Sequence, residues 1–170
     1  MDLYFQGRAR LDKGFSPEQV TQARGFFESA LARDPGNVEA LVGTAYVNVL
    51  RCTSYATDDR AAAFAMAEAA LAKALSLAPE HALAHFVLGL VQTNTNRAPQ
   101  GIAECERALA LDRNLARAHA ALGFAKYNLG RAEETEAHIN EAFRLSPRDT
   151  DAHVWLLVAG VAKFFVGRGA

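Results

Sequence analysis

The residues of this chain whose type and spacing suggest chemistry are histidines. Three of the five, His85, His119 and His153, are separated by steps of 34 residues. Imidazole is a common metal ligand and acid–base group, so a regular row of histidines first suggests a metal site. Helices that pack side by side are about 10 Å apart, whereas zinc holds its ligand nitrogens about 2.1 Å away. We expect the three histidines to lie on three different helices of a repeated structure, too far apart to bind one metal ion. We therefore predict a packing role for the row and no metal site.

The sequence carries no other signature of catalysis. It has no glycine-rich phosphate loop, no HExxH motif and no paired CxxC motif. Glu133, Glu134 and Glu136 fall near the expected start of a helix, where acidic side chains complement the positive end of the helix dipole. We therefore predict no catalytic residue, no cofactor and no enzymatic activity in this chain.

The histidine row belongs to a longer repeated pattern, which predicts the elements that carry it. Residues 82–115 align on residues 116–149 without a gap. The matched pairs are Ala82/Ala116, Ala84/Ala118, His85/His119, Leu88/Leu122, Gly89/Gly123, Asn94/Asn128, Arg97/Arg131, Ala98/Ala132, Ala103/Ala137, Ala108/Ala142 and Leu111/Leu145. A fixed period of this length is typical of helical repeats, in which each unit is a helix, a turn and a second helix.

This pattern resembles the tetratricopeptide repeat family. The positions that carry the resemblance are Leu88-Gly89, Gly101, Cys105 and Ala108 in the first copy, and Leu122-Gly123, Thr135, Ile139, Ala142 and Pro147 in the second. The sequence departs from the family where His85 and His119 replace an aromatic residue and Arg113 replaces the closing proline of the first copy. The resemblance implies an all-α fold, a right-handed superhelix of antiparallel helix pairs with about three and a half repeats.

We expect one repeat domain over residues 8–170. Within it we expect a half repeat at 16–34, a repeat with an insertion at 38–81, regular repeats at 82–115 and 116–149, and a terminal helix at 150–168. Ser16-Pro17-Glu18 is typical of a helix start, since serine caps and proline fits the first helical position. The unit at 38–81 is ten residues longer than its neighbours. We expect the extra residues, near 51–59, to lengthen its helices or form a protruding loop.

Residues 1–7, MDLYFQG, resemble the recognition site of a viral protease that is used to remove purification tags. We therefore expect them to be tag-derived and assign them no function. The helix expected at 16–34 cannot bury both of its faces alone. We expect residues 3–13 to substitute for its missing front helix.

Composition and charge limit the possible partners. A chain of 170 residues with 51% hydrophobic residues can bury one continuous core, and a net charge of −1 provides no field that attracts nucleic acid or an anionic membrane. The longest apolar run, residues 154–166, is broken by Lys163 and is shorter than the ~20 residues that cross a bilayer. Cys52 and Cys105 lie in apolar helical runs, which favours free buried thiols and a reducing compartment. We expect a cytoplasmic protein that binds neither nucleic acid nor a membrane.

In the resembled family the front helices line a concave groove that holds a protein or peptide partner. Carried over residue by residue, the groove here consists of Val42, Tyr46, Val49, Phe86, Leu90, Asn94, Arg117, Phe124, Tyr127 and Asn128. Some members clamp a C-terminal carboxylate with Lys, Asn and Arg, but only Arg117 fits that mode here. The mostly apolar lining suits the nonpolar face of a helix or a hydrophobic extended peptide. The alternative is that these side chains only pack across a tight superhelix.

The end of the chain is a second candidate interaction surface. Its apolar residues are consecutive, so at about 100° per residue they point in all directions around a helix, and the preceding repeat can cover only one side. We expect self-association, as a homodimer or by insertion into a neighbour's groove, through Trp155, Leu157, Val161, Phe164 and Phe165. The alternative is a partly exposed terminal helix.

The amino-acid sequence of the repeats resembles that of one group of proteins in particular. Two stretches are similar to the C-terminal repeat region of bacterial class III adenylate or guanylate cyclases, and to repeats of related transcriptional regulators. They are ALAHFVLGLV and the segment that runs from AHAALGFAKYNLG to FFVGR. The resemblance implies a binding and regulatory module whose parent protein carries a cyclase domain elsewhere. The alternatives are enzymatic activity, as a cyclase or otherwise, in the parent protein, or the repeat region of a transcriptional regulator.

Overall fold

The computed structural model describes residues 2–54 and 57–166, and these residues form nine α-helices and no strand. The helices are α1 (Leu3–Leu11), α2 (Pro17–Arg33), α3 (Val38–Thr53), α4 (Arg60–Leu77), α5 (Ala82–Asn94), α6 (Ala98–Leu111), α7 (Ala116–Asn128), α8 (Ala132–Leu145) and α9 (Ala152–Val166). The all-α fold class predicted from the sequence is confirmed.

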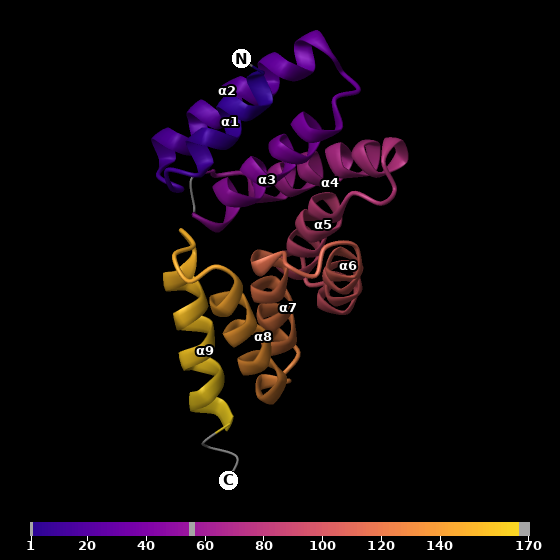
Figure 1. Cartoon of the computed structure of the whole chain (residues 1–170). Coiled ribbons are helices and arrows are strands. Elements are labelled where there is room, and N and C mark those ends of the chain that lie inside the picture. The colour runs from indigo at the N-terminus through magenta and orange to yellow at the C-terminus, as the bar shows by residue number, and fades with distance from the viewer. Residues whose placement is uncertain (1, 55–56, 167–170) are drawn as a thin grey trace.

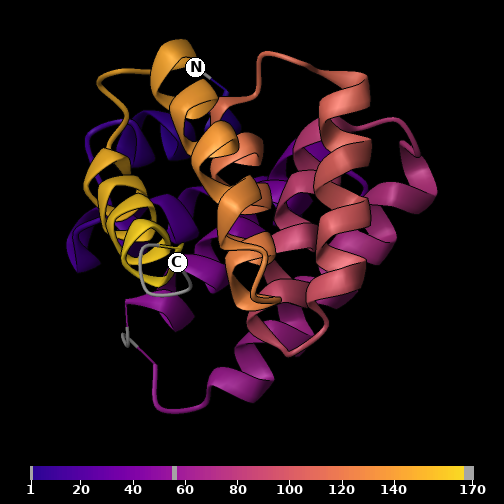
Figure 2. The same cartoon turned by 90° about the horizontal axis from the view of Figure 1, so that it is seen from below.

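The helices pack as successive pairs. α1 packs on α2, α3 on α4, α5 on α6 and α7 on α8, while α9 packs on both helices of the last pair. Each odd-numbered helix also contacts the next odd-numbered one, so these front helices form a continuous inner layer. Figures 1 and 2 show the pairs following one another in a curved stack from α1 and α2 at one end to α9 at the other.

Local signals in the sequence determine where the helices begin. The side chain of Ser16 accepts a hydrogen bond from the backbone of Gln19 at 3.3 Å, which confirms the predicted start of α2 at Pro17. Asn37 and Asp59 cap α3 and α4 in the same way, each with a bond of 2.9 Å. Such caps satisfy backbone N–H groups that have no partner within the helix.

Small residues allow the two helices of a pair to approach closely. A Cβ atom added to Gly89 would lie 2.6 Å from the Cys105 sulfur and 3.0 Å from the Gly101 carbonyl oxygen. At the equivalent Gly123 it would lie 3.2 Å from the Thr135 carbonyl oxygen. Both glycines are therefore contact positions between paired helices, as the repeat alignment indicates.

The first helix pair is complete in the described residues, because α1 takes the place of the front helix, as expected for residues 3–13. α1 supplies the front helix, and its Gly7 faces the fully buried Phe27 ring of α2. A Cβ atom on Gly7 would lie 2.5 Å from that ring. Residues 3–7 thus take part in the packing of the repeat, while the expectation that residues 1–7 derive from a tag stays a prediction.

The insertion in the second unit lengthens both of its helices. α3 has 16 residues against 13 in α5 and α7, and α4 has 18 residues against 14 in α6 and α8. The segment between them includes residues 55–56, which lie outside the described residues. The stack continues past the insertion because the extra turns extend along the helix axes.

One main core runs through the middle pairs, with smaller clusters at each end. Cys52 and Cys105 are both buried and free, as the sequence predicts. None of the helices in the described residues is long and apolar enough to cross a membrane.

Candidate peptide-binding groove

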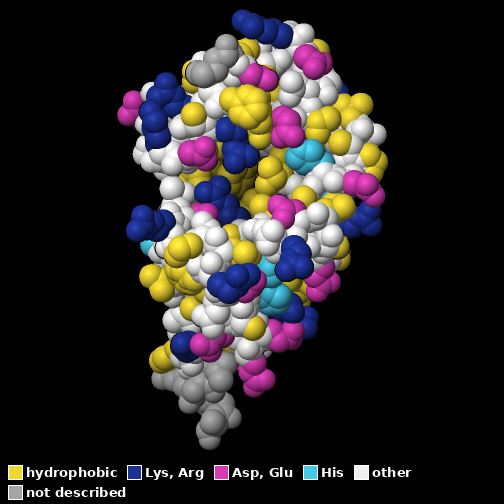
Figure 3. All heavy atoms as spheres, in the orientation of Figure 1, with side chains coloured by type: hydrophobic (Ala, Val, Ile, Leu, Met, Phe, Trp, Pro, Cys, Tyr) yellow, Lys and Arg dark blue, Asp and Glu magenta, His cyan; other side chains and the backbone are white. Residues whose placement is uncertain are grey.

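The inner face of the stack contains a groove of about 730 Å³. Its walls come mainly from the front helices α3, α5, α7 and α9, with one side chain from the loop between α1 and α2. The lining residues are Phe15, Tyr46, Val49, Leu50, Thr53, Ser54, Arg60, Phe86, Leu90, Asn94, Arg117, Ala120, Ala121, Phe124, Ile139, Asp151, His153, Val154, Trp155, Leu157 and Val158. In Figure 3 the surface is hollowed between the N-terminal and C-terminal halves, with hydrophobic side chains at the floor and charged ones on the rim.

Seven of the ten residues that the sequence predicts for the groove line it. They are Tyr46, Val49, Phe86, Leu90, Asn94, Arg117 and Phe124. Val42 lies beside it, in a smaller cavity of about 50 Å³ that shares Tyr46 and Phe86 with the groove. Tyr127 and Asn128, in the last turn of α7, do not line the groove. Beyond α7 the wall of the groove continues with Val154 and Leu157 from the first turns of α9.

The predicted aromatic residues differ in how accessible they are. Phe86 is only 3% exposed and belongs to the main core, with its ring centre 6.0 Å from that of Tyr46. Phe124 is half-buried, and Leu157 is 66% exposed. Phe86 therefore supports the groove floor, whereas Phe124 and Leu157 offer apolar surface that a partner can cover.

Arg117 is held by several groups of the protein itself. Its Nε donates to both carboxylate oxygens of Asp149 at 3.2 Å, and another nitrogen donates to the Thr150 hydroxyl at 3.1 Å. A third nitrogen lies 3.4 Å from the Tyr46 hydroxyl, and the guanidinium carbon lies 5.2 Å from the centre of the Phe15 ring. Burial is the main cause that raises the pKa of Tyr46. Because all three of its nitrogens already contact groups of the protein, Arg117 is poorly suited to clamp a partner's carboxylate.

Two parts of the groove were not predicted from the sequence. Phe15 lies in the loop after α1, far outside the repeat pattern, and only the curvature of the stack brings it to Arg117. The α9 residues did carry a signal, because a step of 34 from Ala120 and Phe124 leads to Val154 and Val158. Extending the family's groove positions by one more repeat would have found them.

α9 has one buried face and one exposed face. Trp155 is 4% exposed and packs edge-on against Phe143 of α8, with ring centres 5.5 Å apart. The exposed side carries Leu156, Leu157 and Phe164, which are 63%, 66% and 54% exposed. Of the residues predicted for self-association, Trp155 is thus buried because α8 covers it, and Val161 is half-buried. The side chain of Phe165 lies outside the described residues.

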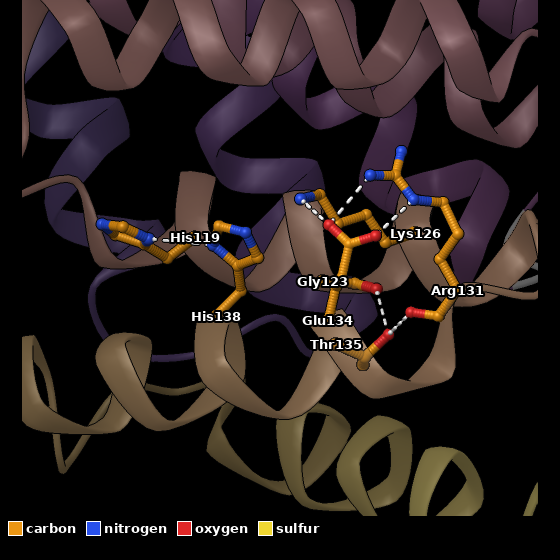
Figure 4. Close-up of polar contacts among 7 residues, drawn as sticks. All are labelled: His119, Gly123, Lys126, Arg131, Glu134, Thr135 and His138. Carbon is orange, nitrogen blue, oxygen red and sulfur yellow. Dashed lines mark hydrogen bonds and ion pairs between the residues drawn. The ribbon is translucent and has the colours of Figure 1, made fainter. Parts of the chain in front are cut away.

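His85 and His119 each contact a side chain on the second helix of their own repeat, and His85 also reaches the preceding repeat at Pro79. His85 lies 2.6 Å from a Glu104 oxygen and 2.9 Å from the Pro79 carbonyl oxygen. The equivalent His119 lies 3.4 Å from His138, nitrogen to nitrogen (Figure 4). The described residues contain no group of three or more side chains placed to hold a metal ion.

α7 and α8 are joined by a small set of polar contacts (Figure 4). Glu134 accepts from Lys126 at 2.8 Å and from Arg131 at 2.5 Å, and these two residues, Arg131 first, lower the pKa of Glu134 to about 2. The Thr135 hydroxyl donates to the Gly123 carbonyl at 3.1 Å. Burial, with Lys126 and His119 nearby, lowers the pKa of His138 to about 4. These contacts hold the two helices together.

Comparison with known proteins identifies the fold. No protein-family model matches the sequence, and no curated protein matches it. Among solved structures, TTC0263, a thermophilic TPR protein from Thermus thermophilus, superposes with a TM-score of 0.72 at 22% identity, covering 92% of this chain and 79% of that one. MamA superposes with a TM-score of 0.61 at 20% identity, covering 99% and 86%.

YrrB is a third structural neighbour, and its structure is described as a TPR protein with an unusual peptide-binding site. It superposes with a TM-score of 0.56 at 21% identity and covers 88% of this chain and 71% of that one. Identities of this size establish a shared architecture. The chain therefore has the fold of the tetratricopeptide repeat proteins, a superhelix of antiparallel helix pairs.

Proposed function

We propose that this chain is a protein-interaction module that binds a hydrophobic peptide or the apolar face of a helix in its groove. The observation that carries the proposal is the groove of about 730 Å³, in which four front helices present partly exposed apolar side chains on one surface. Among the lining residues Leu157 is 66% exposed and Phe124 is half-buried. The peptide-binding site described for YrrB supports the same use of a shared fold.

A matched pair of leucines on α9 allows a direct test. Leu157 lines the groove, while its neighbour Leu156 does not, and the two are almost equally exposed at 66% and 63%. Short random peptides displayed on phage are selected on the wild-type chain and then measured by fluorescence anisotropy. We expect Leu157→Asp and Phe124→Ala to weaken the selected peptides by about tenfold or more. Leu156→Asp is the control and should bind as the wild type does.

Two results would count against this function. One is that no peptide is enriched over an unrelated helical protein. The other is that Leu156→Asp weakens the selected peptides as much as Leu157→Asp does. Circular dichroism of each variant shows that a loss of binding is not a loss of fold.

We further propose that in its source protein the module regulates or recruits a partner for a nucleotide cyclase domain. The support is the resemblance of its repeats to those of class III cyclases. Catalysis belongs, on this view, to the other domain. An assay of this chain alone with ATP or GTP and Mn²⁺ tests the division of labour, and nucleotide turnover above the blank would contradict it.

A second copy of the chain is the partner that we propose for the exposed side of α9. Leu156 and Phe164 are large apolar residues more than half exposed on one helix, and burial of such surface favours association by about 25 cal/mol per Å² before the cost of association. The face is short, so we expect a dimer that forms at micromolar concentrations.

A further inference from the structure

The carboxylate of Asp151 lies on the wall of the groove, just before the first turn of α9. Apolar and aromatic side chains such as Phe15 and Trp155 line the same groove, together with the cationic Arg60 and Arg117. The backbone N–H of Asp151 donates to Asp149 at 3.0 Å, and the Asp151 carbonyl accepts from Val154 and Trp155 at 2.9 and 3.2 Å. The backbone of Asp151 is thus fixed by neighbouring residues.

The backbone of Asp151 has hydrogen-bond partners, but among the described residues its side chain does not. None of these residues makes a hydrogen bond or ion pair with the carboxylate. Arg117 acts electrostatically on Asp151, but its hydrogen bonds go to Asp149, Thr150 and Tyr46. His153 also lies near enough to act electrostatically on Asp151. Burial is the main cause that raises the pKa of Asp151, and it outweighs the opposing influence of Arg117.

Arg117, Asp149 and Asp151 act on one another electrostatically and carry one positive and two negative charges between them. Arg117 and Asp149 form an ion pair with side chains 23% and 9% exposed, and Asp151 adds one negative charge to that pair. A partly buried carboxylate without a partner is unfavourable, and a cation that reaches it with a hydrogen bond offsets the cost of desolvation.

We propose that Asp151 receives the side chain of a lysine or arginine from the bound peptide, so that the groove selects apolar segments that carry one basic residue. The apolar neighbours of that residue would lie on Phe124, Leu157 and Val158, along the same wall. This inference rests on the proposed peptide-binding function. It adds a specificity that the hydrophobic lining alone does not have, since apolar contacts discriminate poorly between sequences.

The test compares peptide selections on the wild-type chain and on Asp151→Asn, which keeps the shape of the side chain and removes its charge. We expect lysine or arginine beside apolar residues to be enriched on the wild type and not on Asp151→Asn. Glu106→Gln is the control for the loss of one negative charge, because Glu106 is exposed on α6 and does not line the groove. Glu106→Gln should keep the enrichment.

One enriched peptide is then synthesised with an acetylated N-terminus and measured by fluorescence anisotropy. Acetylation separates a basic side chain from the other possible cation, the terminal amine. We expect Lys→Gln in the peptide and Asp151→Asn in the protein each to weaken binding about tenfold, and the two together to weaken it no further. Binding that acetylation abolishes would overturn the side-chain assignment.

The outcomes separate this inference from the function on which it rests. Peptides that depend on Leu157 but show no preference for basic residues would overturn the role of Asp151 and leave the groove function standing. Peptides that bind Asp151→Asn and the wild type equally would do the same. If no peptide depends on the groove, the proposed function fails and this inference fails with it.

Discussion

The guanidinium carbon of Arg117 lies 5.2 Å from the centre of the Phe15 ring. Arg117 is in the first turns of α7, while Phe15 is in the loop between α1 and α2, so the contact joins the first helix pair to the fourth. Arg117 also donates to Asp149, in the segment that leads into α9. The curved stack is therefore closed across its inner face by one side chain, and this closure bounds one end of the groove.

Removing Arg117 should destabilise the fold more than an ordinary ion pair would. Asp149 is 9% exposed on its side chain, so Arg117→Ala leaves a nearly buried carboxylate without its cation. We expect a loss of about 2 to 4 kcal/mol in the free energy of unfolding, measured with urea. Arg144→Ala is the matched control, because Arg144 and its partner Glu141 are 67% and 36% exposed, and it should cost at most about 1 kcal/mol. Similar losses in the two variants would argue against the closure.

Two glycines of the helices should respond in opposite ways to alanine. Gly89→Ala places a Cβ atom 2.6 Å from the Cys105 sulfur, and we expect it to lower stability by about 1 to 3 kcal/mol through overpacking. Gly25 has no atom within 4 Å of the equivalent position, so Gly25→Ala should stabilise α2 by up to about 1 kcal/mol. Thermal unfolding of both variants checks the prediction, and an equal response would mean that the α5–α6 contact is looser than the structure shows.

The first seven residues can be tested for a structural role. Gly7→Ala would place a methyl group 2.5 Å from the Phe27 ring, and we expect a fall in stability of about 1 to 3 kcal/mol. Deleting residues 1–7 should have a larger effect, because it uncovers the fully buried Phe27. Differential scanning calorimetry measures both. If the shortened chain unfolds at the same temperature as the full one, residues 1–7 add nothing to the stability of the first pair.

Acid should weaken the contact between α7 and α8. The pKa of His138 is lowered to about 4, below the value of about 6.5 in an unfolded chain. As the pH falls, the unfolded chain binds this proton first, so the contribution is complete above about pH 6.5 and is lost between about pH 6.5 and 4. The histidine is only half-buried, so after allowing for solvent screening we expect a loss of about 1 to 2 kcal/mol.

Urea unfolding across that pH range measures the effect, and His138→Gln should remove it. Histidine ring signals followed by NMR give an independent check. Titration of His138 at an ordinary histidine value would show that its burial and its contact with His119 are not maintained in solution.

The exposed side of α9 should determine the oligomeric state. We expect sedimentation velocity at micromolar concentrations to show a dimer that Leu156→Glu and Phe164→Glu convert to a monomer. Leu157→Glu should have a weaker effect on the dimer, because Leu157 lines the groove. A wild-type chain that sediments as a monomer, or a dimer unchanged by the two substitutions, would exclude this surface as the interface.

The sequence by itself determined the helices and their order. Its signals are local: the 34-residue period, the capping residues Asn37 and Asp59, and the glycines at positions 89 and 123. These features act within one helix or one helix pair, so their consequences can be read over a few turns of chain. For the same reason most of the predicted groove residues of α3, α5 and α7 do meet on one surface.

Only the tertiary structure decided which side chains form the ends and the walls of the groove. The repeat pattern indicated Arg117 as the one residue suited to binding a partner's carboxylate. In the structure Arg117 instead forms hydrogen bonds with Asp149 and Thr150 and lies over the Phe15 ring. In the structure Trp155 is also buried against Phe143, while its neighbour Leu156 is exposed. These relations depend on the curvature that accumulates over four helix pairs. A small rotation at each interface determines which distant side chains finally meet, and no local pattern in the sequence encodes that sum.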